Sequence, residues 1–209
     1  MAGPSRSVLE SGLAATLFPF RTPISELPIA GYRPDSVDRP RPAAVLLGIT
    51  SGTDPGVVLT LRSGVLEHHA GQVSFPGGGR DRPGESVLDT ALREAHEEAG
   101  IERDLVKPLG YLGRYDTISG YRMTTVVALL AESVRLCPDC REVDAVFTVP
   151  LRQVVDPACY RHHKVRHAGR TFDIVTLEHP AYHIWGATAA LLHDFGMRLG
   201  RPGGPRGAF

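Results

Sequence analysis

Residues 79–101 read GRDRPGESVLDTALREAHEEAGI, which predicts a glycine-rich loop followed by a single amphipathic helix. Ser86 is a favourable N-cap residue, Asp89 stands at capping-box distance from it, and Gly100 is a typical helix stop. At about 100° per residue, five apolar side chains fall on one face, which we expect to pack against a sheet. These five are Leu88, Ala91, Leu92, Ala95 and Ala99.

The same helix carries three glutamates, Glu94, Glu97 and Glu98, at spacings of three and four residues. Such spacings place the carboxylates on one face, where they repel each other unless a cation lies among them. Hard oxygen ligands of this kind suit Mg²⁺ or Mn²⁺. The alternative is a solvated acidic surface that pairs with Arg93 and other nearby bases.

The loop before the helix favours the metal interpretation. Gly77–Gly79 are three consecutive glycines, and they lead through Arg80 and Arg82 to a helix N-terminus. Backbone amides at such a bend can face an anion. An anion-binding loop beside an acidic metal site is what metal-assisted diphosphate cleavage requires, since the cation offsets charge at the attacked phosphorus.

These residues match the Nudix box, G-x5-E-x7-R-E-U-x-E-E-x-G-U with U an apolar residue, so the chain resembles the Nudix hydrolase family. The matching positions are Gly79, Glu85, Arg93, Glu94, Ala95, Glu97, Glu98, Gly100 and Ile101. Ala95 is smaller than the usual residue at its position. The resemblance implies an α/β fold, the Nudix α/β/α sandwich with a mixed central sheet, and metal-dependent hydrolysis of a nucleoside diphosphate linked to another group.

The resemblance also implies roles within the box. The expected ligands of Mg²⁺ or Mn²⁺ are Glu94, Glu97, Glu98 and the carbonyl group of Gly79. Glu97 is alternatively the general base that takes a proton from water. Arg93 and Glu85 complete the expected catalytic group as a positioning pair.

Residues 59–78 read LTLRSGVLEHHAGQVSFPGG and resemble the signature of the coenzyme A pyrophosphatase branch, LLTxR(S/A)-x3-R-x3-G-x3-FPGG. The expected substrate-binding residues are Arg62, Ser63, Gln72, Phe75, Gly77 and Gly78. Arg62 suits bidentate binding of a phosphate, with a surface ion pair as the alternative. Phe75 either contacts substrate or packs the loop.

The chain departs from this signature at one charged position, where Glu67 replaces a basic residue. Arg80 or Arg82 are candidate replacements for that base. Downstream segments resemble the same branch, so the likeness covers residues 40–196. Among them Glu142 is a candidate for a further catalytic or metal-binding carboxylate, and the alternative is a solvated loop residue.

The implied reaction is hydrolysis of the diphosphate of coenzyme A or its thioesters to 3′,5′-ADP and (acyl-)4′-phosphopantetheine. One alternative keeps the chemistry and changes the substrate to ADP-ribose, NADH or an oxidised nucleotide. Another is a non-catalytic binding module with the Nudix fold. The expected partner is a small molecule, and the sequence is compatible with a homodimer but does not fix the oligomeric state.

Charge and cysteine content set further expectations. Lys and Arg number 23, as do Asp and Glu, so a neutral chain gives no general reason to bind nucleic acid or a membrane. Three cysteines and the absence of a long apolar run favour the cytoplasm. One further pattern has zinc-site spacing, and its four residues are Cys137, Cys140, Cys159 and His162. A thiol–disulfide role for the first two is the alternative.

We expect three parts along the chain. Residues 1–39 form an N-terminal arm with a short helix and a Pro-rich linker, 40–199 the Nudix domain, and 200–209 a flexible tail. Strands are expected at 43–49, 57–62, 109–115, 123–131 and 145–149, with a hairpin over 164–177 and a closing helix over 184–199.

Overall fold

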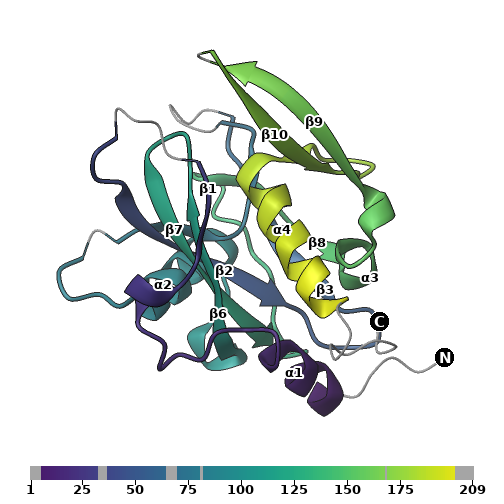
Figure 1. Ribbon diagram of the computed structural model, residues 1–209. Coiled ribbons are helices and arrows are strands. Elements are labelled where there is room, and N and C mark those ends of the chain that lie inside the picture. The colour runs from purple at the N-terminus through teal and green to yellow at the C-terminus, as the bar shows by residue number, and fades with distance from the viewer. Residues whose placement is uncertain (1–5, 33–36, 65–69, 81, 168, 201–209) are drawn as a thin grey trace.

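The computed structural model describes residues 6–32, 37–64, 70–80, 82–167 and 169–200, and Figure 1 shows their arrangement. Glu67 and nearly all of the predicted tail, residues 201–209, lie outside the described residues. No helix in the described ranges has both the length and the apolar character needed to cross a membrane.

A mixed sheet forms the centre of the molecule, as predicted. Its path is β1-β6-β7-β2-β3-β4, with β5 paired to β2 and β8 paired to β3. The strands are β1 Ile29–Gly31, β2 Arg41–Ile49, β3 Gly56–Arg62, β4 Val73–Ser74, β5 Gly77–Gly79, β6 Val106–Asp116, β7 Tyr121–Leu130 and β8 Val143–Pro150. The β1–β6 and β2–β7 pairs are parallel, whereas the other pairs are antiparallel.

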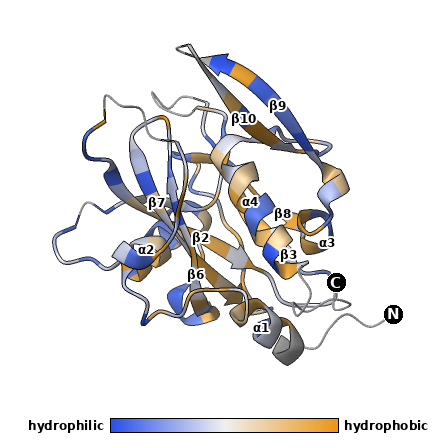
Figure 2. Cartoon of the chain, in the orientation of Figure 1, coloured by the Kyte–Doolittle hydropathy of each residue, from blue (hydrophilic) through white to orange (hydrophobic). Residues whose placement is uncertain are grey.

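Helices cover both faces of this sheet, which confirms the α/β/α sandwich (Figure 1). The α-helices are α1 Arg6–Ala14, α2 Val87–Ala99, α3 Leu151–Val154 and α4 Gly186–Leu199. Short 3₁₀ helices cover Ile24–Glu26, Arg103–Leu105 and Pro157–Cys159. Because side chains alternate along a strand, Leu46 of β2 packs on the α2 side while its neighbour Leu47 packs on the α4 side. Figure 2 shows the hydrophobic colour concentrated along these inner elements.

A smaller antiparallel sheet lies beside α4. It contains β9 (Tyr160–His167), β10 (Arg170–Leu177) and β11 (Ile184–Trp185), and the β9–β10 hairpin extends beyond the central sheet (Figure 1). The hairpin confirms the prediction for this region. The closing helix begins at Gly186 and not at Ile184, because Gly186 has φ +63° and thus separates strand β11 from the helix.

Four short strands were not predicted, β1, β4, β5 and β11, and two of them replace an expected linker or loop. β1 falls within the stretch expected to be a Pro-rich linker, and it adds a parallel edge strand to β6. β5 consists of the three glycines expected to form a loop, and it pairs with Ala43–Val45 of β2. Both strands are defined by their partners in the sheet, since neither has the alternating pattern that predicts a strand.

Candidate active site

Helix α2 forms as its local sequence predicts. The Ser86 hydroxyl accepts a hydrogen bond from the backbone N–H of Asp89 at 3.1 Å, and Gly100 ends the helix at φ 67°. The buried face includes Ala91, Ala95 and Ala99, all with 0% exposure. Small residues there let the helix lie close to β2 and β7, and the glutamates on the neighbouring face are thereby brought against the edge of the sheet.

Arg93 is the centre of an ion-pair network on this helix. Its guanidinium group donates to both carboxylate oxygens of Glu85, at 2.8 and 3.1 Å, and lowers the pKa of that carboxyl group. Nη1 donates to Glu94 at 2.7 Å and to Glu97 at 2.8 Å. Nη2 also donates to the Gly79 carbonyl at 3.2 Å. One side chain therefore gathers four of the residues that the sequence assigned to the site.

Glu98 lies deeper than the other glutamates, with 2% of its side chain exposed. Arg62 of β3 donates to Oε1 at 3.0 Å, and the backbone N–H of Gly77 donates to Oε2 at 3.1 Å. Burial nevertheless raises the pKa of Glu98 to about 7, because removing an ionised carboxylate from water costs more than these two contacts return.

The glycines of β5 allow helix and sheet to approach each other here. A Cβ atom added to Gly78 would lie 2.6 Å from the carboxylate carbon of Glu94. A Cβ atom on Gly77 would lie 2.5 Å from the Ala44 carbonyl oxygen. The glycine run is thus a strand whose missing side chains make room for Glu94, which in turn is buried enough that its pKa is raised.

Negative charge exceeds positive charge around this cluster. Burial is the main cause of the raised pKa values of Glu94 and Glu98, and the negative charge of Glu142, in the loop before β8, adds to both. The carboxylates are Glu85, Glu94, Glu97, Glu98 and Glu142, and the guanidinium groups that pair with them belong to Arg62, Arg82 and Arg93. When all five carboxylates are ionised, they exceed the three guanidinium groups by two negative charges, which one divalent cation would neutralise.

The donor set fits such a cation chemically, because carboxylate and carbonyl oxygens are hard ligands. Within the described residues, however, no three His, Cys, Asp or Glu side chains converge as a ready-made metal cage. The reason is visible in the contacts: Nη1 of Arg93 bonds to both Glu94 and Glu97, and Arg62 bonds to Glu98. Metal binding would therefore exchange guanidinium contacts for metal contacts.

Comparison with known proteins agrees with this site. Residues 39–168 match the sequence profile of the NUDIX domain. The chain belongs to the Nudix family. It is 36% identical over 163 residues to "Uncharacterized Nudix hydrolase NudL" of Pectobacterium atrosepticum, which covers 78% of this chain and 85% of the relative. The protein of the same name from Photorhabdus laumondii is 37% identical over 162 residues, or 78% and 87% of the two chains.

Among solved structures, a Nudix hydrolase from M. smegmatis, RenU, is similar over 55% of this chain and 73% of its own. Its sequence identity is 30% and its TM-score 0.45. A MutT/nudix family protein from Enterococcus faecalis matches 78% of this chain and 62% of its own, at 20% identity and a TM-score of 0.48.

The substrate-binding residues predicted for this Nudix domain separate into two groups. Arg62, Gly77 and Gly78 contact or border the Nudix helix, as described above. The backbone N–H of Ser63 donates to the Glu142 carbonyl at 2.9 Å, which ties the end of β3 to the loop that carries Glu142. Gln72 is half-buried beside them, and its carbonyl accepts from the backbone N–H of Arg62 at 2.9 Å.

Phe75 belongs to the second group. Its side chain is 3% exposed and packs in the hydrophobic cluster on the α4 side of the sheet. Of the two roles that the sequence allowed for Phe75, the structure shows packing of the loop, and the side chain has almost no surface available to a ligand.

Arg82 was missed as a partner in the Nudix site. It donates to Glu97 at 3.1 Å and is 63% exposed. Arg80 points elsewhere, since its guanidinium group donates to the backbone carbonyl of Glu85 at 2.6 Å. Both arginines lie in the loop before α2, and no sequence signal indicates which of them contacts a glutamate of the box.

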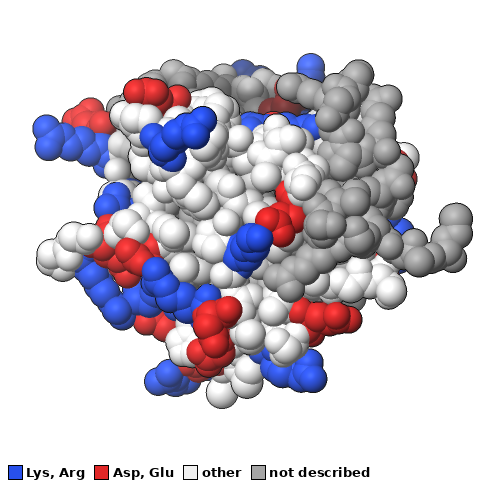
Figure 3. All heavy atoms as spheres, turned by 90° about the horizontal axis from the view of Figure 1, so that it is seen from below, with Lys and Arg blue, Asp and Glu red and all other residues white. Residues whose placement is uncertain are grey.

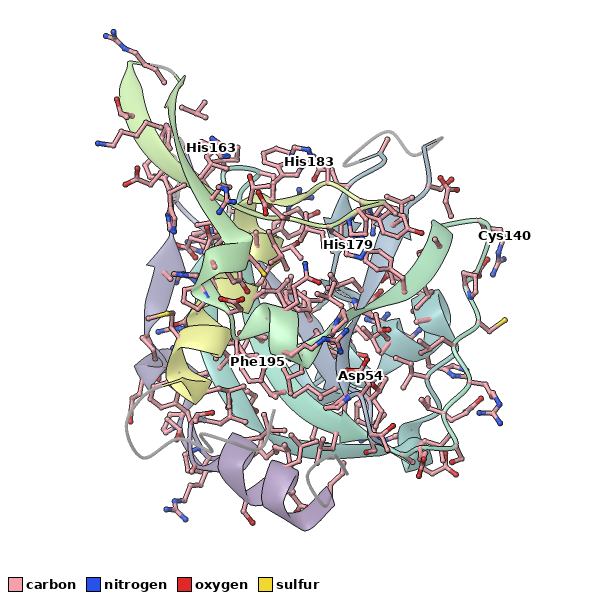
Figure 4. The ribbon with its side chains drawn as sticks, turned by 90° about the vertical axis from the view of Figure 1, so that its right-hand side faces the viewer. Asp54, Cys140, His163, His179, His183 and Phe195 are labelled. Atoms are coloured by element: carbon pink, nitrogen blue, oxygen red, sulfur yellow. The ribbon has the colours of Figure 1, made fainter. Side chains whose placement is uncertain are left out.

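The zinc interpretation is wrong for the described residues, where no group of metal-binding side chains includes the cysteines. Cys137 and Cys140 are exposed in the loop before β8, whereas Cys159 pairs with Asp156 next to β9. Figure 4 shows Cys140 on the opposite side of the molecule from His163, the neighbour of His162. The sequence spacing suggested a cluster, but strand β8 lies between Cys137/Cys140 and Cys159/His162 in the chain and separates the two pairs in space.

Proposed function

We propose that this Nudix hydrolase cleaves the diphosphate of coenzyme A or its thioesters, with Mg²⁺ or Mn²⁺ as cofactor. The products would be 3′,5′-ADP and 4′-phosphopantetheine or its acyl form. One observation carries the choice of substrate: Arg62 and Gly77, two residues of the coenzyme A signature, both hydrogen-bond to Glu98 of the Nudix box. These contacts support the proposal that the signature segment forms one wall of the diphosphate site.

A second wall supports the same assignment. β8 pairs with β3 along its length, and its first residue Val143 lies opposite Arg62. This pairing places Glu142, from another segment that resembles the coenzyme A branch, beside the signature residues. The diphosphate would lie between these strands and the carboxylate face of α2.

The metal would be held by Glu94, Glu97, Glu98 and the Gly79 carbonyl. When bound, it would polarise the diphosphate and offset the charge that develops at phosphorus. Glu97 is the best placed of these carboxylates to accept a proton from water, because its side chain is 45% exposed, against 14% for Glu94 and 2% for Glu98. Glu142 is the second candidate for that proton. Arg93 and Glu85 are a positioning pair, since the guanidinium group is held by Glu85 and contacts both Glu94 and Glu97.

The substrate is tested by product identification. The full chain is incubated with coenzyme A and Mg²⁺ or Mn²⁺, and the products are identified by mass spectrometry. 3′,5′-ADP together with 4′-phosphopantetheine is the expected result. Parallel reactions use 3′-dephospho-coenzyme A, ADP-ribose and NADH, which lack the 3′-phosphate. If the enzyme recognises this phosphate, coenzyme A should give the highest kcat/KM.

A second candidate substrate class keeps the same chemistry. Glu67 in place of the signature's basic residue favours a nucleoside diphosphate derivative without a 3′-phosphate, such as ADP-ribose or NADH. Turnover of these compounds without cleavage of coenzyme A would decide for this class. Metal binding without turnover of any compound in the panel would instead indicate a binding module.

A further inference from the structure

A pocket of about 340 Å³ lies near the N-terminal end of α2. It is built from segments that are far apart in the chain, including the 3₁₀ helix at Ile24, the start of β2 at Pro42 and the first turn of α2 at Val87. At 1.5 Å per residue, Val87 is about 16 Å along the helix axis from Glu98. The pocket thus lies at the opposite end of α2 from Glu98, and it borders the site at Glu85, whose backbone carbonyl accepts a hydrogen bond from Arg80.

Four arginines line this pocket, and Asp38 is the one acidic residue in its lining among the residues that the structure describes. The four arginines are Arg39, Arg80, Arg114 and Arg122. They come from the segment before β2, from the loop after β5, and from the paired strands β6 and β7. In a chain without net charge, this is a local concentration of positive charge.

Three of the four arginines have no carboxylate partner among the described residues. Arg80 donates to a backbone carbonyl, and Arg114 donates to the carbonyl oxygens of Ser25 and Leu27 at 2.6–3.0 Å. Carbonyl groups fix the direction of a guanidinium group without neutralising its charge. Arg39 is exposed and has no ion pair with any residue that the structure describes.

Arg122 is the exception, because Asp116 accepts two hydrogen bonds from it at 2.6 and 2.7 Å. Arg114 and Arg122 still lie close enough to affect each other. Burial first, and then the charge of Arg122, lower the pKa of Arg114. A bound anion would relieve this repulsion and add charge-assisted hydrogen bonds.

We propose that this pocket binds the phosphate group of a small molecule, through Arg39, Arg80 and Arg114. Phosphate suits the site better than a carboxylate, because its several oxygens can each accept from a different guanidinium group. The apolar side chains of Ile24 and Val87 would contact the organic part of such a ligand. The phosphate belongs either to a separate metabolite or to a remote part of the substrate.

Calorimetric titration of the metal-free full chain with inorganic phosphate tests the site without requiring turnover. We expect saturable binding that becomes at least about tenfold weaker in the Arg39→Ala/Arg80→Ala double variant, since two charge-assisted contacts are lost. Arg166→Ala on the exposed strand β9 is the matched control, and it should bind phosphate as the unmodified protein does. Arg39→Glu alone, an exposed change that does not disturb packing, should also weaken binding.

Unchanged phosphate affinity in the double variant would overturn the proposal, as would the absence of saturable binding at millimolar phosphate. Kinetics then distinguish the two sources of the phosphate. A higher KM for coenzyme A, but not for 3′-dephospho-coenzyme A, in the Arg39→Ala/Arg80→Ala variant would assign it to the substrate. Unchanged KM values together with lost phosphate binding would assign it to a separate ligand. Because binding is measured without catalysis, failure of the proposed enzymatic function would leave this test intact.

Discussion

The two ends of helix α2 have opposite electrostatic character. Near its C-terminal end, carboxylates outnumber the guanidinium groups that pair with them, and burial raises the pKa of Glu98 to about 7. Beyond its N-terminal end, arginines outnumber the acidic groups and bond mostly to neutral carbonyls. One helix therefore separates a site suited to a cation from a site suited to an anion.

The net charge of the chain does not reveal this difference between the two ends of α2. The chain carries equal numbers of basic and acidic residues, and on the face seen in Figure 3 red and blue side chains lie next to one another. Affinity for phosphate-containing compounds therefore depends on where a few arginines and glutamates are placed. The predictions below change one end of the helix at a time.

The largest effect is expected from Glu98→Gln at the acidic end. Removing one negative charge from the metal-binding group should lower kcat/KM by about 10³-fold, the upper range for loss of one preorganised electrostatic contact. The fold should persist, because the amide oxygen can still accept from Gly77 or Arg62. Steady-state kinetics and thermal unfolding measure the two effects. Glu102→Gln, 62% exposed just beyond the helix, is the control, and near-normal activity of Glu98→Gln would refute the metal role.

The second prediction concerns space at the acidic end. In Gly78→Ala, the new methyl group would meet the Glu94 carboxylate at 2.6 Å and displace it. We expect kcat/KM to fall by about a hundredfold, because displacements near 1 Å have costs of this order. Gly64→Ala is the matched control, since no atom lies within 4 Å of its added Cβ. Equal kinetics of the two variants would contradict the close approach of β5 and α2.

Stability should depend strongly on Arg93. Arg93→Ala leaves Glu85, Glu94 and Glu97 without their shared partner, and we expect the free energy of unfolding to fall by about 3 kcal/mol. Urea unfolding measures this change, and added Mg²⁺ should restore part of it. Arg103→Ala removes an exposed pair with Asp89 and should cost less than about 0.5 kcal/mol. If Arg93→Ala lowered the free energy of unfolding no more than Arg103→Ala does, the ion-pair network would not stabilise the helix.

The smallest effect is expected at the basic end, from Asp116→Asn. This change neutralises the carboxylate that pairs with Arg122 and so increases the positive charge of the pocket. Affinity for inorganic phosphate should rise about threefold, because the negative charge of one buried carboxylate is removed from beside the pocket. Calorimetry measures the change, and weaker phosphate binding would contradict the assignment of the pocket.

Local patterns were sufficient to predict α2. The N-cap at Ser86, the stop at Gly100 and the apolar face all depend on neighbours within one or two turns of the same helix. The same holds for the β9–β10 hairpin, whose two strands are joined by a short connection. The glycine strand β5 was predicted as a loop because glycine carries no strand signal, and its pairing depends on the backbone of β2 instead.

Side-chain partners of the candidate site were predicted less completely. Proximity of Arg93 to the glutamates follows from helical spacing, but the pairing of Arg62 with Glu98 joins residues 36 positions apart. The cysteine pattern failed for the converse reason, since a regular spacing was interrupted by strand β8. The basic pocket had no sequence signal, because its four arginines occupy separate segments of the chain.

The sequence by itself determined the acidic helix, its ends and the family to which the chain belongs. These properties depend on residue types at fixed short spacings, which an α-helix converts directly into shared faces. Only the tertiary structure decided that three glycines form a strand against Glu94, that Arg62 neutralises Glu98, and that separated arginines share one pocket. Such contacts depend on strand register and on the packing of helices against the sheet, which bring distant segments within hydrogen-bonding distance.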